Sequence, residues 1–214
     1  MSNCSCVRVD VNATEPLENL LRFVMPSTPQ IAYDLAMDML RQSYTEFARK
    51  SNLLVSHFEI STQKDVREYV IVPPEGYEVY GLLGEAKDGN TYIRYPNPDT
   101  WFFSWGQRMR MVGNSMLVFQ DAPSRDAVKH GVVLHLLPTV CATDIPTEIS
   151  TPFGEGIAMG VVARALEMPK QAWSDIPLAQ LKRREFSRAA LSARNLHIAG
   201  RGAIAPAFKP IRII

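Results

Sequence analysis

Cysteine is scarce in this chain of 214 residues, and its three cysteines, Cys4, Cys6 and Cys141, form an odd set without a pairing framework. This usage is typical of reduced thiols, so we expect the protein to be made and used in the cytosol. Cys4 and Cys6 have the spacing of half a metal site, but no second pair of Cys or His residues at ligand spacing accompanies them. We therefore predict no metal site.

Long apolar runs and an excess of either charge are also missing. The N-terminal sequence MSNCSCVRVDVNATEP has no apolar segment of the kind that a signal peptide contains, so we expect no signal peptide. No stretch approaches the roughly 20 apolar residues of a membrane-spanning helix, so we expect no membrane partner. The 23 Lys and Arg residues nearly balance the 22 Asp and Glu residues, which gives a net charge of +1. With 46% hydrophobic residues, the chain is long enough to bury a core as one globular unit, with or without an inserted module.

The motifs of common enzymes are absent as well: the sequence has no Walker loop, no G-x-S-x-G and no H-E-x-x-H. Gly154-Glu155-Gly156 resembles the start of a dinucleotide-binding motif, but Met159 stands at its third position and no βαβ unit follows, so close helix packing explains these glycines better. His130 and His135 are an odd number of residues apart, so on one continuous strand they point to opposite faces and do not share a metal ion. We therefore expect a protein that is not an enzyme and that has no catalytic residue and no cofactor.

The first part of the chain is predicted to be helical. The apolar spacing indicates a short helix over Pro16 to Val24. A longer amphipathic helix follows, with Thr28 as its N-cap and Pro29 at its first position. One face of this longer helix is expected to pack into a bundle. That face carries Ala32, Ala36, Met39, Leu40, Ser43 and Phe47.

Beyond Ser51 the hydrophobic period changes from about 3.6 to 2, which predicts strands. A hairpin is expected across Lys87 to Asn90, and Gly113-Asn114 is the signal of a two-residue turn. The middle third of the chain is therefore predicted to be β. The expected strands are Leu54 to Ile60, Glu68 to Val72, Tyr77 to Leu83, Gln107 to Val112, Ser115 to Phe119 and Val132 to Leu137.

Two consecutive helices are predicted near the end of the chain. The first has Thr151 as its N-cap and Pro152 at its first position, is apolar on nearly all sides, and ends at Glu167-Met168-Pro169. The second begins at Ser174 or Asp175 and is amphipathic. Its predicted apolar face carries Leu178, Leu181, Phe186, Ala189, Ala193 and Leu196.

The order of helices, strands and helices predicts an α+β fold. We expect a discontinuous helical bundle with an inserted antiparallel β module, either a sandwich or barrel-like, and an extended C-terminal tail. The expected divisions are residues 1–52 for an N-terminal arm and the first helices, 53–149 for the β module, 150–196 for the C-terminal helix pair, and 197–214 for the tail.

Two segments are candidates for binding. The basic helix from Arg183 to Arg194 suits contact with nucleic-acid phosphates, or else a solvated face paired with neighbouring carboxylates. The segment from Tyr92 to Trp105 is dense in aromatic side chains, which suits a local core under a long loop or a contact with another subunit. Its candidate contact residues are Trp101, Phe102, Phe103 and Trp105.

Five segments occur in an informative order: LRQSYTEFARKS (Leu40 to Ser51), EYVIVPPEGYEV (Glu68 to Val79), VVLHLLPTVCATDIPTEI (Val132 to Ile149), GIAMGVVARALEMPKQAWSDIPLA (Gly156 to Ala179) and RREFSRAALSAR (Arg183 to Arg194). Over most of residues 17–195 this order resembles the head-to-tail adaptor proteins of tailed bacteriophages, including the tail tubular protein A type of short-tailed phages. In that family a buried helix rich in Gly and Ala precedes a break with Pro and Trp-Ser/Asp, here Pro169 and Trp173-Ser174-Asp175. A helix with a central Phe follows, here Phe186. The aromatic segment Tyr92 to Trp105 is longer here, so no role is carried over to it.

The resemblance implies a structural virion protein without an active site. Such adaptors are helical bundles with a β module, and they form a ring, typically dodecameric, beneath the portal. The implied partners are further copies of the chain, the portal, a tail nozzle or tube protein, and double-stranded genomic DNA in transit. The implied location is the neck or tail of the virion, with the host cytoplasm during assembly. The alternative is a nucleic-acid-binding module that uses the basic helix from Arg183 to Arg194.

The last residues suggest how such a ring is joined. After Glu185 the sequence has no acidic residue, and its end is basic and apolar. In the adaptor family, extended termini commonly clamp a neighbouring subunit or the portal, and an alternating apolar end can add as a strand to a sheet edge or dock in a groove. We expect this anchor to comprise Phe208, Lys209, Ile211, Arg212, Ile213 and Ile214.

Overall fold

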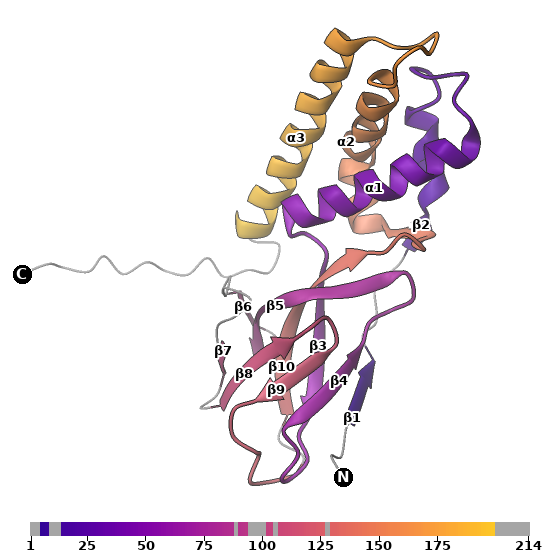
Figure 1. Cartoon of the computed structure of the whole chain (residues 1–214). Coiled ribbons are helices and arrows are strands. Elements are labelled where there is room, and N and C mark those ends of the chain that lie inside the picture. Colours follow the sequence, from indigo (N-terminus) through magenta and orange to yellow (C-terminus); the bar gives the residue numbers. More distant parts are fainter. Residues whose placement is uncertain are drawn as a thin grey trace, which may run out of the picture.

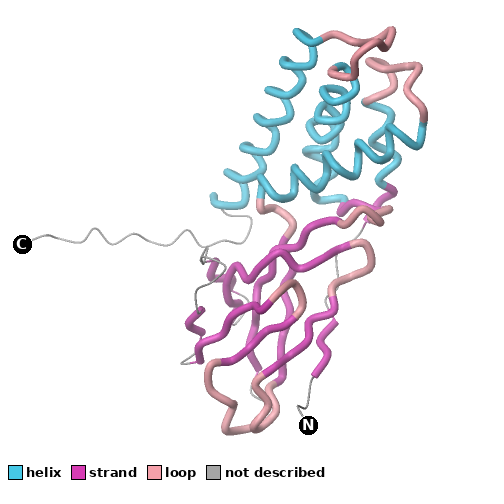
Figure 2. The backbone as a smooth tube through the Cα atoms, viewed as in Figure 1, coloured by secondary structure: helices cyan, strands magenta, loops and turns pink. Residues whose placement is uncertain are grey.

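The chain folds into a module of helices and a module of β-sheets. The structure is a computed structural model, and it describes residues 5–8, 14–87, 90–93, 102–104, 107–126 and 129–199. The helices lie at one end of the molecule and the two larger sheets at the other (Figure 1 and Figure 2). The predicted mixed α+β class is confirmed.

Four described helical segments make up the helical module. They are the 3-10 helix η1 (Leu17–Phe23) and the α-helices α1 (Tyr33–Ser51), α2 (Thr147–Leu166) and α3 (Ile176–Ala199). The ring of Phe47 in α1 lies between the other two long helices. Its centroid is 5.7 Å from that of Phe153 in α2 and 6.3 Å from that of Phe186 in α3. Segments from both ends of the chain therefore share one core.

The helix α1 begins later than the capping signal predicts, so the prediction of Thr28 as N-cap and Pro29 as first residue is wrong. The Thr28 hydroxyl donates instead to the Val24 carbonyl, 3.2 Å away, and closes the turn that follows η1. The helix starts at Tyr33, after Ala32 as N-cap. Ala32, which was predicted on the apolar face, is exposed because it precedes the first helical turn.

The helix α2 begins earlier than predicted, at Thr147, so Thr151 is not its N-cap and Pro152 is not its first residue. Both Ile149 and Ser150 are buried, and their burial extends the helix backwards from the predicted start. Pro152 removes the backbone donor of the Glu148 carbonyl, and both residues lie on the exposed side of α2, where water can reach that carbonyl. The predicted end is confirmed, since α2 stops at Leu166.

Most of the described strands pair in antiparallel fashion, and β1 with β4 is parallel. One sheet has the order β1 (Ser5–Arg8), β4 (Glu68–Val72), β9 (Met116–Phe119), β8 (Gln107–Val112) and β7 (Phe102–Ser104). A second has the order β3 (Val55–Ser61), β10 (Lys129–Pro138), β5 (Tyr77–Lys87) and β6 (Asn90–Ile93). A third pairs β11 (Asp144–Pro146) with β2 (Thr14–Pro16).

The two hairpin predictions have different outcomes. Pairing of Lys87 with Asn90 confirms the first. The second hairpin exists, but Val112 pairs with Met116, so three residues rather than two connect β8 to β9. Gly113 opens this turn with φ at +62°, a left-handed conformation that glycine adopts without strain.

The two larger sheets lie against each other through aromatic contacts. Phe119 of β9 stacks edge-on against Tyr69 of β4, with centroids 5.4 Å apart, and also lies 5.5 Å from the ring of His130 in β10. Because His130 belongs to the second sheet, this contact joins the sheets. Both Tyr69 and Phe119 are fully buried.

Hydrogen bonds fix the helical module to the β module. Thr45 of α1 donates its hydroxyl to the Pro138 carbonyl at the end of β10, 3.0 Å away. A ring nitrogen of His135 lies 3.3 Å from the Ala48 carbonyl. The Tyr77 hydroxyl donates to the Asp144 carbonyl over 3.1 Å and lies 3.4 Å from the hydroxyl of Tyr44, whose pKa is raised well above its ordinary value by burial.

Candidate interaction surface

Close packing of α2 sets the position of α3. A Cβ atom on Gly156 would lie 2.4 Å from the Cβ of Ala189 in α3. A Cβ on Gly160 would lie 2.2 Å from the Ser43 Oγ of α1 and 2.8 Å from the ring of Phe186. Only a residue without a side chain fits at these positions. The prediction that these glycines serve helix packing is therefore supported by the geometry.

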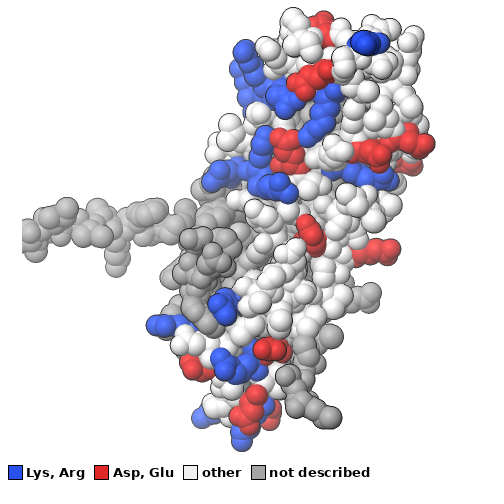
Figure 3. Space-filling model, viewed as in Figure 1, with Lys and Arg blue, Asp and Glu red and all other residues white. Residues whose placement is uncertain are grey.

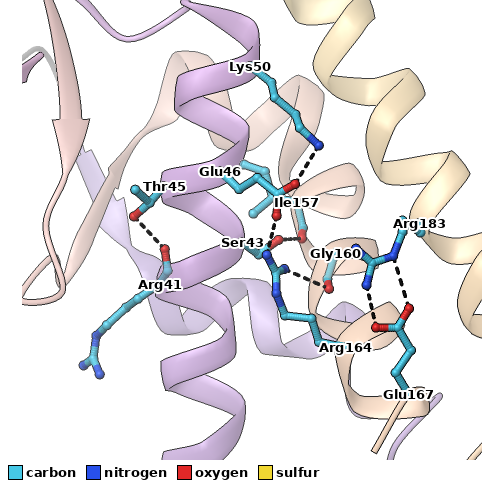
Figure 4. Close-up of polar contacts among 10 residues, drawn as sticks. All are labelled: Arg41, Ser43, Thr45, Glu46, Lys50, Ile157, Gly160, Arg164, Glu167 and Arg183. Carbon is cyan, nitrogen blue, oxygen red and sulfur yellow. Dashed lines mark hydrogen bonds and ion pairs between the residues drawn. The ribbon is translucent and has the colours of Figure 1, made fainter.

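Polar contacts cross the three α-helices on one side of the module (Figure 4). Ser43 donates its hydroxyl to the Ile157 carbonyl of α2, 2.6 Å away. Glu46 of α1 accepts from Lys50, one turn further on, at 2.6 Å and from Arg164 of α2. Burial raises the pKa of Glu46, but Lys50 and Arg164 together outweigh burial, so the pKa lies below its ordinary value. Glu46 is therefore ionised near neutral pH and connects α1 to α2.

The buried face of α3 differs from the predicted one. Phe186, Ala190 and Ala193 are almost fully buried. Leu178, Leu181 and Leu196 are 37, 48 and 43% exposed, so their assignment to the buried face is wrong. A helix that covers α1 and α2 from one side buries a single stripe, and the stripe centred on Phe186 leaves these leucines outside it.

Some of the basic residues of α3 have structural partners. Arg183 donates to both carboxylate oxygens of Glu167, at 3.2 and 2.5 Å, and Lys182 pairs with Glu185 at 3.0 Å. Arg184, Arg188 and Arg194 are exposed and form no ion pair with a residue that the structure describes. The basic helix therefore has some cations paired with carboxylates and others exposed on its surface.

Four exposed residues of α3, spaced three, four and three apart, define one line on the side opposite Phe186. They are Leu181, Arg184, Arg188 and Leu191, and we call them the outer stripe. Leu191 is 58% exposed. Sequence analysis did not single out this set, although its spacing is visible in the sequence. Figure 3 shows Lys and Arg gathered over α3, with some Asp and Glu among them, and a further group of Asp and Glu at the opposite edge, near the start of α1.

The other predicted contact residues are only partly placed. Phe102 and Phe103 lie on β7, where their backbones pair with Met109 and Arg108 of β8. Trp101 and Trp105 lie outside the described residues, as do Phe208, Lys209, Ile211, Arg212, Ile213 and Ile214. The start of the predicted tail needs correction, because α3 continues to Ala199 instead of ending at residue 196.

The two histidines whose side chains the structure describes make different contacts. His130 contacts Phe119 between the sheets, whereas His135 contacts Tyr80, with ring centroids 5.1 Å apart, and α1. Within the described ranges, no three or more His, Cys, Asp or Glu side chains are placed to hold a metal ion. No described helix combines the length and apolar character needed to cross a membrane.

No protein-family model matches this chain, and no curated protein sequence matches it. The resemblance to phage adaptors therefore rests on the order of the sequence segments.

Proposed function

We propose that this chain is a structural virion protein, an adaptor that forms a ring between the portal and the tail of a phage. In this role α1, α2 and α3 are the discontinuous bundle of the adaptor, and the two larger sheets are its inserted module. The ring forms part of the conduit through which the genome passes. Its partners are further copies of the chain, the portal and a tail nozzle or tube protein.

The observation that carries this proposal is the exposed apolar and basic surface of α3. Leu181 and Leu191 are about half exposed and flank two arginines. Protein interfaces are enriched in arginine and bury apolar side chains at their centres. A surface of this composition suits contact with another polypeptide. The motif order quoted above supplies the particular class of assembly.

The test is removal of residues 200–214. Because α3 ends at Ala199, the cut falls after the last described helix, and we expect a folded subunit that no longer joins the portal. The truncated and full-length chains would each be mixed with the portal protein of the same phage. Bound copies would be measured by native mass spectrometry and by electron microscopy. A second variant keeps the full length and replaces Phe208, Ile211, Ile213 and Ile214 by serine.

Both altered chains are expected to show unchanged circular dichroism and to lose portal binding. Unchanged joining by both would remove the anchor role of the tail. Failure of the full-length chain to join the portal would contradict the adaptor function itself.

The second candidate is the nucleic-acid-binding module, which the open cationic groups Arg184, Arg188 and Arg194 favour. A gel shift on duplex DNA at near-physiological salt separates the two functions, because a conduit should not grip the DNA that it passes. Tight binding by the isolated subunit would favour the module. In that case Arg184→Gln with Arg188→Gln should lower the slope of log K against log salt by about 2.

A further inference from the structure

Resting on the proposed ring, we infer that successive copies join head to tail, with the outer stripe of α3 in one copy bound to the start of α1 in the next. The receiving surface consists of four exposed residues around that start. They are Glu18, Tyr33, Asp34 and Asp38, and we call them the acidic start.

The acidic start has the mixed character of a binding surface. The Tyr33 ring is 51% exposed, and its hydroxyl donates to Glu18 over 2.8 Å. The Asp38 side chain is 66% exposed and has one ion pair, 3.0 Å to Arg41. An exposed aromatic ring beside carboxylates suits arginine, which binds a carboxylate and stacks on a ring.

The outer stripe and the acidic start match in spacing as well as in sign. Arg184 and Arg188 are one helical turn apart, and so are Asp34 and Asp38, so each pair spans about 6 Å along its helix. Two carboxylates can therefore face two guanidinium groups when the helices lie side by side. Leu181 and Leu191 flank the arginines and can cover the Tyr33 ring. A nucleic-acid backbone would leave these leucines without a partner.

The two surfaces cannot meet within one molecule. α3 contacts α1 near the C-terminal end of α1, where the Lys50 amino group lies over the Phe186 ring, 5.2 Å from the ring centroid. Asp34 lies four to five turns earlier in α1, roughly 20 Å away along the helix axis. In Figure 3 the group of Lys and Arg over α3 and the group of Asp and Glu near the start of α1 lie at opposite edges of the helical module, and charges of the other sign lie beside both groups. When two different but complementary surfaces lie on opposite edges of a subunit, the contact between copies is heterologous. Such contacts close into a ring when the rotation between successive copies permits it.

Charge reversal tests this contact. One full-length variant carries Arg184→Glu and Arg188→Glu, and a second carries Asp34→Lys and Asp38→Lys. Each variant alone places like charges across the contact, so we expect its self-association to weaken roughly 100-fold. In an equal mixture the two contacts that alternate around the ring are both attractive, because one is native and the other is fully reversed. Assembly should therefore return in the mixture.

The readout is the number of copies in the assembly, measured by native mass spectrometry with and without the portal protein. The matched control reverses two exposed cations outside the outer stripe, with Arg194→Glu and Lys170→Glu, and should assemble as the wild type does. Thermal unfolding monitors the fold of every variant.

The outcomes separate this inference from the proposed function. If the wild type assembles and both reversed variants assemble equally well, or if the mixture fails to recover, the head-to-tail contact is wrong and the ring stands. If the wild type forms no assembly, alone or on the portal, the adaptor function is wrong and this contact is wrong with it.

Discussion

Helices α2 and α3 are neighbours in the chain and in space, but they meet their surroundings in different ways. α2 is buried on almost every side along its second half, from Ile157 to Ala163. α3 is buried along one stripe around Phe186 and exposes leucines elsewhere. α2 is therefore a buried core helix of the subunit, whereas α3 has apolar surface that its own subunit does not cover.

The difference shows what excess apolar surface indicates. Every large apolar side chain of α2 belongs to the buried core cluster, so its composition is explained by the fold. On α3 the fold explains Phe186 but not Leu181 or Leu191. Exposed apolar side chains occur singly on most proteins, but two that flank a pair of arginines on one line form a patch that favours a partner.

The largest expected loss of stability comes from disturbing the close packing of α2. Gly160→Ala places a Cβ where 2.2 Å separates it from Ser43 Oγ, so Ser43 must move and lose its bond to the Ile157 carbonyl. The clash and the lost hydrogen bond exceed the gain of roughly 1 kcal/mol in helix propensity. We expect the free energy of unfolding to fall by about 2 kcal/mol in urea titrations. Glu155→Ala, on the exposed side of the same helix, should change it little.

An unchanged stability in Gly160→Ala would mean that α2 is not held in close contact with α1 and α3. The contrast between the two helices would then be lost.

The next largest loss of stability is expected from removing the ion pair between α1 and α2. Glu46→Gln removes the carboxylate that accepts from Arg164 and Lys50, and we expect a loss of about 1 kcal/mol near neutral pH. The pKa of Glu46 in the folded chain lies below its ordinary value of 4.5, so its contribution is complete above that value and is lost as the pH falls through the folded pKa.

Urea titrations of wild type and variant from pH 7 downward test this effect. The gap between the two free energies of unfolding should stay constant above pH 4.5 and narrow below it. A gap that widens on acidification would contradict the role given to Glu46. Glu155→Gln on the exposed side of α2 is the matched control.

Sequence patterns were most informative where the composition of a segment is compatible with a single structural environment. The all-round apolar character of α2 allows only burial, and Pro169 ends the helix region. Asp175, predicted at the start of α3, does cap it, since its carboxylate accepts from the Leu178 backbone amide over 2.9 Å. The strand from Glu68 to Val72 matches β4 because its apolar residues alternate cleanly.

The wrong predictions came from signals that tertiary contacts override. Thr28 and Thr151 are good N-caps by type, but neighbouring buried residues decide where α1 and α2 begin. The strand β1 was missed because its pairing with β4 joins segments far apart in the sequence. Likewise, no local pattern connects Glu46 with Arg164.

The smallest expected change in stability tests whether α3 has exposed apolar surface that no part of its own subunit covers. Leu191→Gln keeps helix propensity and removes an apolar side chain that is 58% exposed, so the free energy of unfolding of the subunit should change by less than about 0.5 kcal/mol. Its neighbour Ala190 is 1% exposed, and Ala190→Gln should cost about 1.5 kcal/mol because it overfills the contact with the bundle and buries an amide. Urea titration of the two variants side by side measures both. A loss in Leu191→Gln as large as that in Ala190→Gln would show that another part of the same chain covers the outer stripe, which would leave no surface there for a second copy.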